Sequence, residues 1–173
     1  IKNIEDDTTE IRDKFINNII IDKEENLWLS LNNGIAKVEI TSPLLIDDSL
    51  FELDSEVNNM VRHKNTLFVS TMKGVYKETP KGFKKLDGID SNAWEMLSFN
   101  DSLLVATNEG IYQIAEKIKK LNITNENILS IIKLNEKIYF STPTELKVVE
   151  FKDSEFQIIK SFKTNIQAWN LTA

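Results

Sequence analysis

Leu27-Trp28-Leu29-Ser30-Leu31-Asn32-Asn33-Gly34-Ile35 is the stretch that decides the fold, because the chain returns to it three more times. The later copies are Leu67-Phe68-Val69-Ser70-Thr71-Met72-Lys73-Gly74-Val75, Leu103-Leu104-Val105-Ala106-Thr107-Asn108-Glu109-Gly110-Ile111 and Ile138-Tyr139-Phe140-Ser141-Thr142-Pro143-Thr144-Glu145-Leu146. They begin about 40, 36 and 35 residues apart, and the last copy has lost its glycine. Periods of this length are typical of solenoids, propellers and other arrays of one small unit.

Each repeat divides into four short apolar runs separated by turn residues. In the third repeat the first run begins at Trp94, and the others are 102–107, 111–114 and 118–121. Runs rich in β-branched and aromatic residues, bounded by Asn, Asp and Gly, indicate strands joined by hairpins. The runs lack a 3.6-residue period, which excludes helical repeats. Four antiparallel strands per repeat make one blade of a β-propeller.

The predicted fold is therefore all-β, with residues 1–173 forming a single propeller segment. We expect four four-stranded blades at about 14–50, 56–88, 92–122 and 127–161. Residues 1–4 resemble the last strand of a preceding blade, and residues 165–171 resemble the first strand of a following one.

These two end pieces lack the middle strands of a blade, so a closed four-bladed ring is disfavoured. We expect instead a segment of a larger propeller of about seven blades. Such a segment exposes blade faces and strand edges, which favours a homo-oligomer or another protein partner.

Composition limits the classes of partner. The formal net charge is -6, and the only arginines are Arg12 and Arg62, which argues against binding to nucleic acid. No apolar run is long enough to insert into a membrane. The chain has no cysteine, which excludes disulfides, zinc–thiolate sites and thiol nucleophiles. No signal peptide is visible, and because the chain begins at Ile1 rather than at a methionine, we expect it to be cut from a longer protein. Its richness in Ile, Lys and Asn suggests a bacterial gene.

No catalytic residue, metal site or cofactor is predicted. His63 is the only histidine, so a multi-histidine metal site cannot be built. The segment from Asp22 to Asn26 lacks the glycine and the distal glutamate of a calcium loop, and we interpret it as a hairpin turn. Carboxylates are so plentiful that no pair stands out as a glycosidase pair.

Two tryptophans are candidate ligand-binding residues. Trp94 and Trp169 occupy equivalent positions near the start of innermost strands, whose entrances face the surface where propellers usually bind ligands. Aromatic rings there could stack on a sugar or a peptide, although packing is the usual role of such rings. Amides recur at the same entrances, where they could bind a polyhydroxylated ligand or cap turns. These amides belong to Asn17, Asn58, Asn92 and Asn127. Trp28, in the middle of a strand, is expected to pack in the core.

Acidic residues concentrate in the connections between blades. These connections should lie on one face of the propeller, where the acidic residues would form an acidic rim. The rim could bind a cation or a basic partner, or it could keep the surface solvated. Its members are Asp6, Asp7, Glu10, Asp47, Asp48, Glu52, Asp54, Glu56, Asp87 and Asp90.

Residues 20–35 resemble the two-component-regulator propeller repeat. The family pattern is an apolar pair, Asp, a turn, Asn-Leu-Trp, a small residue, Thr, two residues, Gly and an apolar residue. Departures from it are Glu25 at the turn glycine, Leu31 at the threonine, and Phe68, Leu104 and Tyr139 at the tryptophan. The match is good in the first repeat, partial in the second and third, and poor in the fourth.

The resemblance implies the ligand-sensing region of a bacterial sensor kinase or related regulator. In that family a β-sandwich, a membrane helix and an output domain usually follow such blades, and the blades are periplasmic. The ligand is then a small molecule, a glycan or a peptide. Two alternatives stay open, namely a protein–protein interaction scaffold and a carbohydrate-active propeller enzyme.

Overall fold

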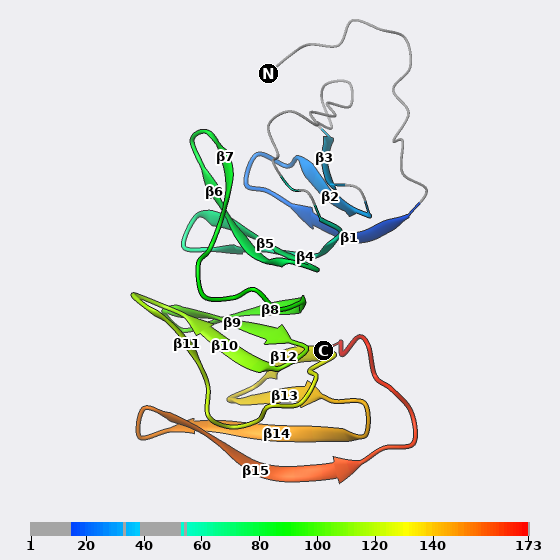
Figure 1. Ribbon diagram of the computed structural model, residues 1–173, viewed down its shortest axis with the longest axis vertical. Coiled ribbons are helices and arrows are strands. Elements are labelled where there is room, and N and C mark those ends of the chain that lie inside the picture. Colours follow the sequence, from blue (N-terminus) through cyan, green and yellow to red (C-terminus); the bar gives the residue numbers. More distant parts are fainter. Residues whose placement is uncertain (1–14, 33, 39–52, 54, 173) are drawn as a thin grey trace, which may run out of the picture. The chain divides into compact units, whose positions relative to one another are not determined.

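The computed structural model describes residues 15–32, 34–38, 53 and 55–172, and the regular secondary structure of this part consists of β-strands (Figure 1). It forms two compact units, Ile1–Leu86 and Asp87–Ala173. The expected strand at 1–4 and the expected last strand of the first blade, within 39–50, lie outside the described residues. The described residues include no helix that could cross a membrane.

The first unit contains two sheets. Sheet 1 consists of β1 (Ile16–Ile21), β2 (Leu27–Leu31) and β3 (Gly34–Val38). Sheet 2 consists of β4 (Val57–His63), β5 (Thr66–Thr71), β6 (Gly74–Thr79) and β7 (Gly82–Lys85).

The second unit also contains two sheets. Sheet 3 consists of β8 (Ala93–Phe99), β9 (Ser102–Thr107), β10 (Gly110–Ile114) and β11 (Ile118–Lys120). Sheet 4 consists of β12 (Ser130–Leu134), β13 (Lys137–Ser141), β14 (Glu145–Lys152) and β15 (Glu155–Lys163).

In every sheet each strand pairs antiparallel with the next strand along the chain. The predicted turn at Asn100-Asp101 joins β8 to β9, with Asn100 in the left-handed region at φ 51°. Gly110 opens β10 at φ 130°, a conformation that residues with a side chain rarely adopt. Local turn chemistry therefore produces the strands and hairpins that the sequence predicts.

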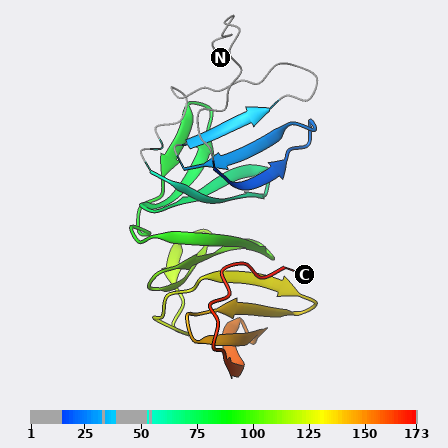
Figure 2. The same cartoon turned by 90° about the vertical axis from the view of Figure 1, so that its right-hand side faces the viewer.

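Within each unit the two sheets pack face to face (Figure 2). In the first unit Ile20, Trp28 and Ile35 of sheet 1 pack with residues of sheet 2 such as Met60 and Val69. In the second unit one buried cluster joins sheets 3 and 4. Its members are Phe99, Leu104, Ala106, Ile111, Leu121, Ile128, Ile131, Ile138, Phe140, Val149 and Phe156.

A β-bulge recurs in the first strand of three sheets. The pairing register shifts between Ile16 and Asn18, between Val57 and Asn59, and between Ala93 and Glu95. The extra residues are thus Asn17, Asn58 and Trp94. A bulge leaves its extra residue unpaired and changes the direction of that side chain. The same position of the repeat therefore leaves the regular strand pairing in each of these three sheets.

Residues 165–171, predicted as the first strand of a following blade, carry no strand in the structure, and their place in a following blade stays a prediction. β15 ends at Lys163, and residues 164–172 form no regular element. In this segment the carbonyl of Ala168 accepts a hydrogen bond from Ser141 Oγ over 2.6 Å, and Leu171 N donates to Ser130 Oγ over 3.0 Å. A strand needs a neighbouring strand to pair its backbone, whereas here two serine hydroxyls bind main-chain groups.

Candidate functional site

Trp94 and Trp169, which the sequence placed in two different blades, contact each other. Trp94 occupies the bulge of β8, and Trp169 lies in the irregular segment after β15. Their ring centroids are 5.5 Å apart with an interplanar angle of 79°, an edge-to-face arrangement that aromatic quadrupoles favour. Trp169 is 53% exposed and Trp94 is half-buried, so the pair presents aromatic surface to solvent.

Asn127 is hydrogen-bonded to one of the two tryptophans. The indole Nε1 of Trp94 donates to Asn127 Oδ1 over 2.9 Å. The amide oxygen accepts this bond, so the Nδ2 group of Asn127 is left to donate hydrogen bonds to another group. Within the described part of the chain neither Asn127 Nδ2 nor the indole nitrogen of Trp169 has a hydrogen-bond partner. Two donors therefore lie beside two aromatic rings.

Glu95 follows the bulge, and its carboxylate is held by the neighbouring sheet. Glu95 Oε2 accepts hydrogen bonds from Ser130 Oγ over 2.6 Å and from Ile131 N over 2.7 Å. Burial raises the pKa of the Glu95 carboxyl above its usual value, and these two hydrogen bonds lower it only in part. Ser130 Oγ also accepts from Leu171 N, so Glu95 and Ser130 together fix the segment that carries Trp169.

We call Trp94, Glu95, Asn127, Ser130 and Trp169 the tryptophan cluster. The sequence singled out three of its members and missed Glu95 and Ser130. A signal for these two was present, because the position after the bulge is polar in all four repeats. The four residues at this position are Asn18, Asn59, Glu95 and Ser130.

The other asparagine candidates have different partners. Asn17 Nδ2 donates to the carbonyl of Val57 over 3.0 Å and to Asn32 Oδ1 over 2.9 Å, which links sheet 1 to sheet 2. Asn58 Nδ2 lies 3.7 Å from Met72 Sδ. The carbonyl of Asn92 accepts from Asn108 N over 3.0 Å. Asn127 is hydrogen-bonded to a candidate tryptophan, and ligand binding by any of the six candidates stays a prediction.

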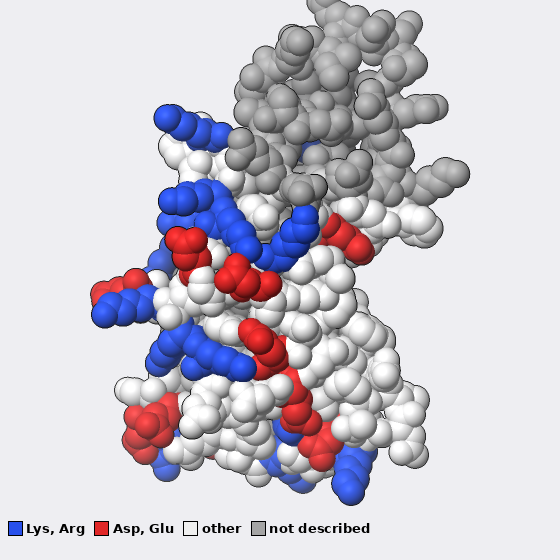
Figure 3. Space-filling model, viewed as in Figure 1, with Lys and Arg blue, Asp and Glu red and all other residues white. Residues whose placement is uncertain are grey.

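The acidic residues do not form a metal centre in the described part of the chain, where no group of three or more His, Cys, Asp or Glu side chains is arranged to hold a metal. Of the proposed acidic rim, only Glu56, Asp87 and Asp90 are described residues. Figure 3 shows acidic and basic side chains intermixed on the described surface that faces the viewer. The remaining members of the rim lie outside the described residues.

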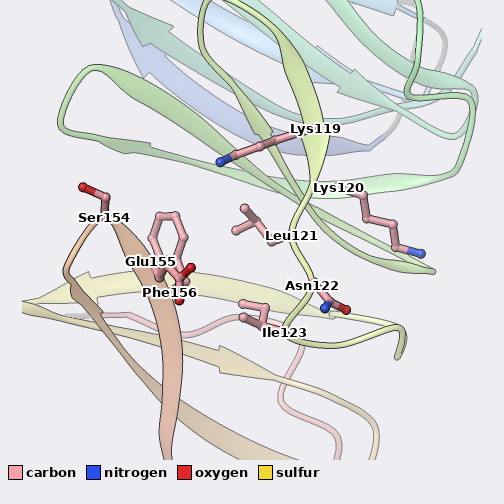
Figure 4. A pocket seen from close by; sticks show the side chains of 8 residues that line it. All are labelled: Lys119, Lys120, Leu121, Asn122, Ile123, Ser154, Glu155 and Phe156. Carbon is pink, nitrogen blue, oxygen red and sulfur yellow. The ribbon is translucent and has the colours of Figure 1, made fainter.

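A separate hollow of about 340 Å³ lies between the segment around β11 and the turn between β14 and β15 (Figure 4). Leu121 and Phe156 face each other across it, and the Lys120 side chain points away. Its lining residues are Lys119, Lys120, Leu121, Asn122, Ile123, Ser154, Glu155 and Phe156. None of the candidates from the sequence contributes to it.

Comparison with solved structures identifies the fold as propeller-like. The extracellular domain of the hybrid two-component system BT4673 of B. thetaiotaomicron is similar at 18% identity and a TM-score of 0.70, over 84% of this chain and 21% of that one. The corresponding domain of BT3049 from the same organism is similar at 16% identity and a TM-score of 0.67, over 86% of this chain and 25% of that one.

A more distant propeller gives the same result. The WD40 domain of Neurospora crassa Pan2 is similar at 12% identity and a TM-score of 0.60, over 88% of this chain and 51% of that one. No family model matches the chain, and no curated protein matches it in sequence. The chain thus corresponds to about a fifth to a half of the length of these structures, and the likeness shows the fold: an all-β, propeller-like array of antiparallel sheets.

Proposed function

We propose that this chain is a non-catalytic, ligand-binding propeller segment of a bacterial signal-transduction protein, located outside the cytoplasm. The observation that carries the proposal is the tryptophan cluster, where two aromatic rings and two hydrogen-bond donors meet at one solvent-exposed place. The likeness to extracellular domains of two-component systems supports the sensory role and the extracytoplasmic location.

The chemistry of the cluster defines the kind of ligand that it would bind. The exposed surface of Trp169 offers a stacking partner for an apolar or C–H-rich face, and Asn127 Nδ2 offers a donor to a hydroxyl or carbonyl oxygen. A sugar ring, a peptide and a small aromatic molecule each present such a face beside an oxygen. The proposed ligand therefore belongs to one of these classes.

The proposal assigns no reaction to the cluster. Glu95 is its one carboxylate, and Glu95 Oε2 is engaged by Ser130 Oγ and Ile131 N. A carboxylate held by two donors of a neighbouring sheet stabilises the arrangement of the strands. Turnover of a glycan by this chain would favour the alternative of a carbohydrate-active enzyme.

Binding can be tested by calorimetric titration of the chain with panels of oligosaccharides and short peptides. For any ligand found, Trp169→Ala and Asn127→Ala should weaken binding by at least about tenfold, since each removes one direct contact worth about 1.4 kcal/mol or more. Trp28→Phe is the matched control, because Trp28 is a half-buried tryptophan of the other unit. A ligand whose affinity is unchanged in both cluster variants would overturn the proposed site.

A protein-interaction scaffold is the second candidate, and exposed apolar side chains favour it. Ile16, Ile19 and Ile21 of β1 are exposed, as are Leu134 of β12 and Phe162 of β15. Contacts made through such side chains bury apolar area and respond little to salt, unlike contacts made through an acidic rim. The salt dependence of any association therefore distinguishes the two surfaces.

A further inference from the structure

The hairpin of β14 and β15 is longer than the equivalent hairpins of sheets 2 and 3. β14 and β15 contain eight and nine residues, whereas β6 and β7 contain six and four, and β10 and β11 contain five and three. Asp153 and Ser154 form its two-residue turn with φ values of 52° and 67°, a conformation that suits the twist of the flanking strands. This turn lies across from the segment after β11, and the two line the hollow of about 340 Å³ (Figure 4).

Packing holds both walls of this hollow in place. On one side the Phe156 ring has its centroid 4.7 Å from that of Phe151 and 5.6 Å from that of Phe99 in sheet 3. On the other side Leu121 N donates to the carbonyl of Ile111 over 2.8 Å, which ties this segment to β10. Leu121 and Phe156 are 7% and 9% exposed, and they face each other across the hollow. The hollow therefore has a pre-formed apolar floor, as ligand sites usually have.

Polar side chains on the rim of the hollow have no partner among the described residues. Lys119 and Asn122 are exposed on either side of Leu121, and Ser154 and Glu155 are exposed at the turn. None of these four side chains takes part in a hydrogen bond or an ion pair within the part of the chain that the structure describes. An ammonium, an amide and a hydroxyl group are thus left to donate to a bound molecule.

The two lysines of the rim differ in direction. The Lys119 side chain points toward the side of the hollow on which Phe156 and Ser154 lie, whereas the Lys120 side chain points away (Figure 4). Lys120 Cε lies 3.1 Å from the place that a Cβ on Gly110 would occupy, so this side chain packs on the hairpin of β9 and β10. Lys119 is therefore the cation that a ligand in the hollow would meet.

We propose that the hollow binds a small organic anion, in which one carboxylate is attached to an apolar ring or chain. The Lys119 ammonium group pairs with the carboxylate, and the apolar part lies over Leu121 and Phe156. The volume of about 340 Å³ equals that of about ten waters at about 30 Å³ each, which suits one small molecule. Glu155 lies on the same rim, and its charge opposes a ligand with two negative charges. The site shares no residue with the tryptophan cluster and is independent of the proposed function.

Benzoate is the probe, because it combines one carboxylate with one apolar ring. In ¹H–¹⁵N spectra of the chain it should produce saturable shifts of the main-chain signals of residues 119–123 and 154–156, with a Kd on the order of 1 mM. The indole signals of Trp94 and Trp169 should not move. Benzamide has nearly the same shape without the charge and should bind about threefold more weakly. This difference should disappear in about 0.5 M salt, which screens an exposed ion pair.

Two neighbouring lysines supply the test of the site. Lys119→Gln removes the proposed cation and should weaken benzoate binding by about threefold, while benzamide binding stays unchanged. Lys120→Gln is the matched control, because it removes the same charge from a side chain that points away from the hollow. The benzoate Kd of this control should stay within about twofold of the wild-type value, since water and salt screen the more distant charge. Both lysines are exposed, so neither substitution should change the thermal unfolding midpoint.

Four results would overturn the proposal. These are the absence of saturable shifts with benzoate, shifts confined to the tryptophan cluster, equal binding of benzoate and benzamide, and equal losses of benzoate affinity in the two lysine variants.

Discussion

The indole Nε1 of Trp28 donates a hydrogen bond to Asp22 Oδ2 over 2.9 Å, across the hairpin that joins β1 to β2. Asp22 is buried, and its Oδ1 also accepts from the main-chain N–H groups of Glu24 and Asn26. The predicted hairpin turn is confirmed. Trp28 is half-buried and packs against the core of the first unit, so the expected core role is accompanied by a polar one. The Asp, Asn and Trp of this repeat therefore stabilise one turn.

Asp22→Ala should destabilise the first unit. The substitution removes a charged acceptor and leaves Trp28 Nε1 and two main-chain donors without it, and hydrogen bonds to charged groups contribute about 1.5–3 kcal/mol each. We expect a loss of about 2–4 kcal/mol in the free energy of unfolding, measured by urea denaturation at neutral pH. Glu24→Ala in the same turn is the control and should change stability by less than about 0.5 kcal/mol.

Asp22 should also make stability depend on pH in the acid range. Burial raises its pKa, but hydrogen bonds from Trp28, Asn26 and Glu24 outweigh burial and lower the pKa to about 2, from an ordinary value of 3.8. A carboxyl whose pKa is lower in the folded than in the unfolded chain adds to the free energy of unfolding, and this stabilisation is complete above the unfolded pKa. It is lost as pH falls from about 4 to about 2. Urea midpoints across this window should fall less steeply in Asp22→Asn than in the wild type. Equal slopes would contradict the assignment.

Glu95 should have the opposite pH dependence. Its folded pKa is raised by burial, so the folded chain holds the proton more tightly, and stability falls as pH rises from the ordinary 4.5 through the folded pKa. Glu95→Gln keeps an acceptor for Ile131 N and removes the charge, so it should be neutral or stabilising at pH 7. Glu95→Ala leaves that buried N–H without its acceptor and should cost about 1–3 kcal/mol. Thermal unfolding of both variants at pH 5 and pH 7 distinguishes the effect of the Glu95 charge on stability from the effect of its hydrogen bonds.

Ser130→Ala should release the segment that carries Trp169. The substitution removes the acceptor of Leu171 N and one donor to Glu95. In ¹H–¹⁵N spectra the indole signals of Trp94 and Trp169 should move, while that of Trp28 should stay. Ser70→Ala is the control, because Ser70 is also a fully buried serine, but its hydroxyl bonds within its own sheet to the carbonyl of Asn59. An unchanged Trp169 signal in Ser130→Ala would show that the segment is held by other contacts.

Two hairpin glycines should differ in their tolerance of a methyl group. Gly34 and Gly110 have φ values of 122° and 130°, so alanine is strained at both by about 1–3 kcal/mol. A Cβ at Gly110 would also lie 2.6 Å from the carbonyl oxygen of Thr124, whereas a Cβ at Gly34 meets nothing within 4 Å. Gly110→Ala should therefore destabilise the chain by more than Gly34→Ala does, as measured by urea denaturation. Equal losses in the free energy of unfolding would mean that the backbone at Thr124 moves to accept the methyl group without destabilising the chain.

The sequence by itself determined the strands and the hairpins of the described sheets. The turn at Asn100-Asp101 and the hairpin glycines Gly34, Gly74 and Gly110 determine the backbone conformation of only two or three residues. Their effect can therefore be predicted from the local sequence. The apolar runs between them form the strands, and β5 and β9 are buried at almost every residue, as expected for strands with a sheet on each face. Local chemistry of this kind is visible in a linear chain, and it was enough to predict the all-β fold.

Only the tertiary structure decided which residues meet. Trp94 contacts Trp169, and Glu95 accepts a hydrogen bond from Ser130, across separations that no local pattern encodes. The same holds for residues 165–171, whose sequence suits a strand but whose backbone bonds to serine side chains. Strand formation depends on a neighbouring strand and burial depends on what packs above, and both are properties of the folded chain.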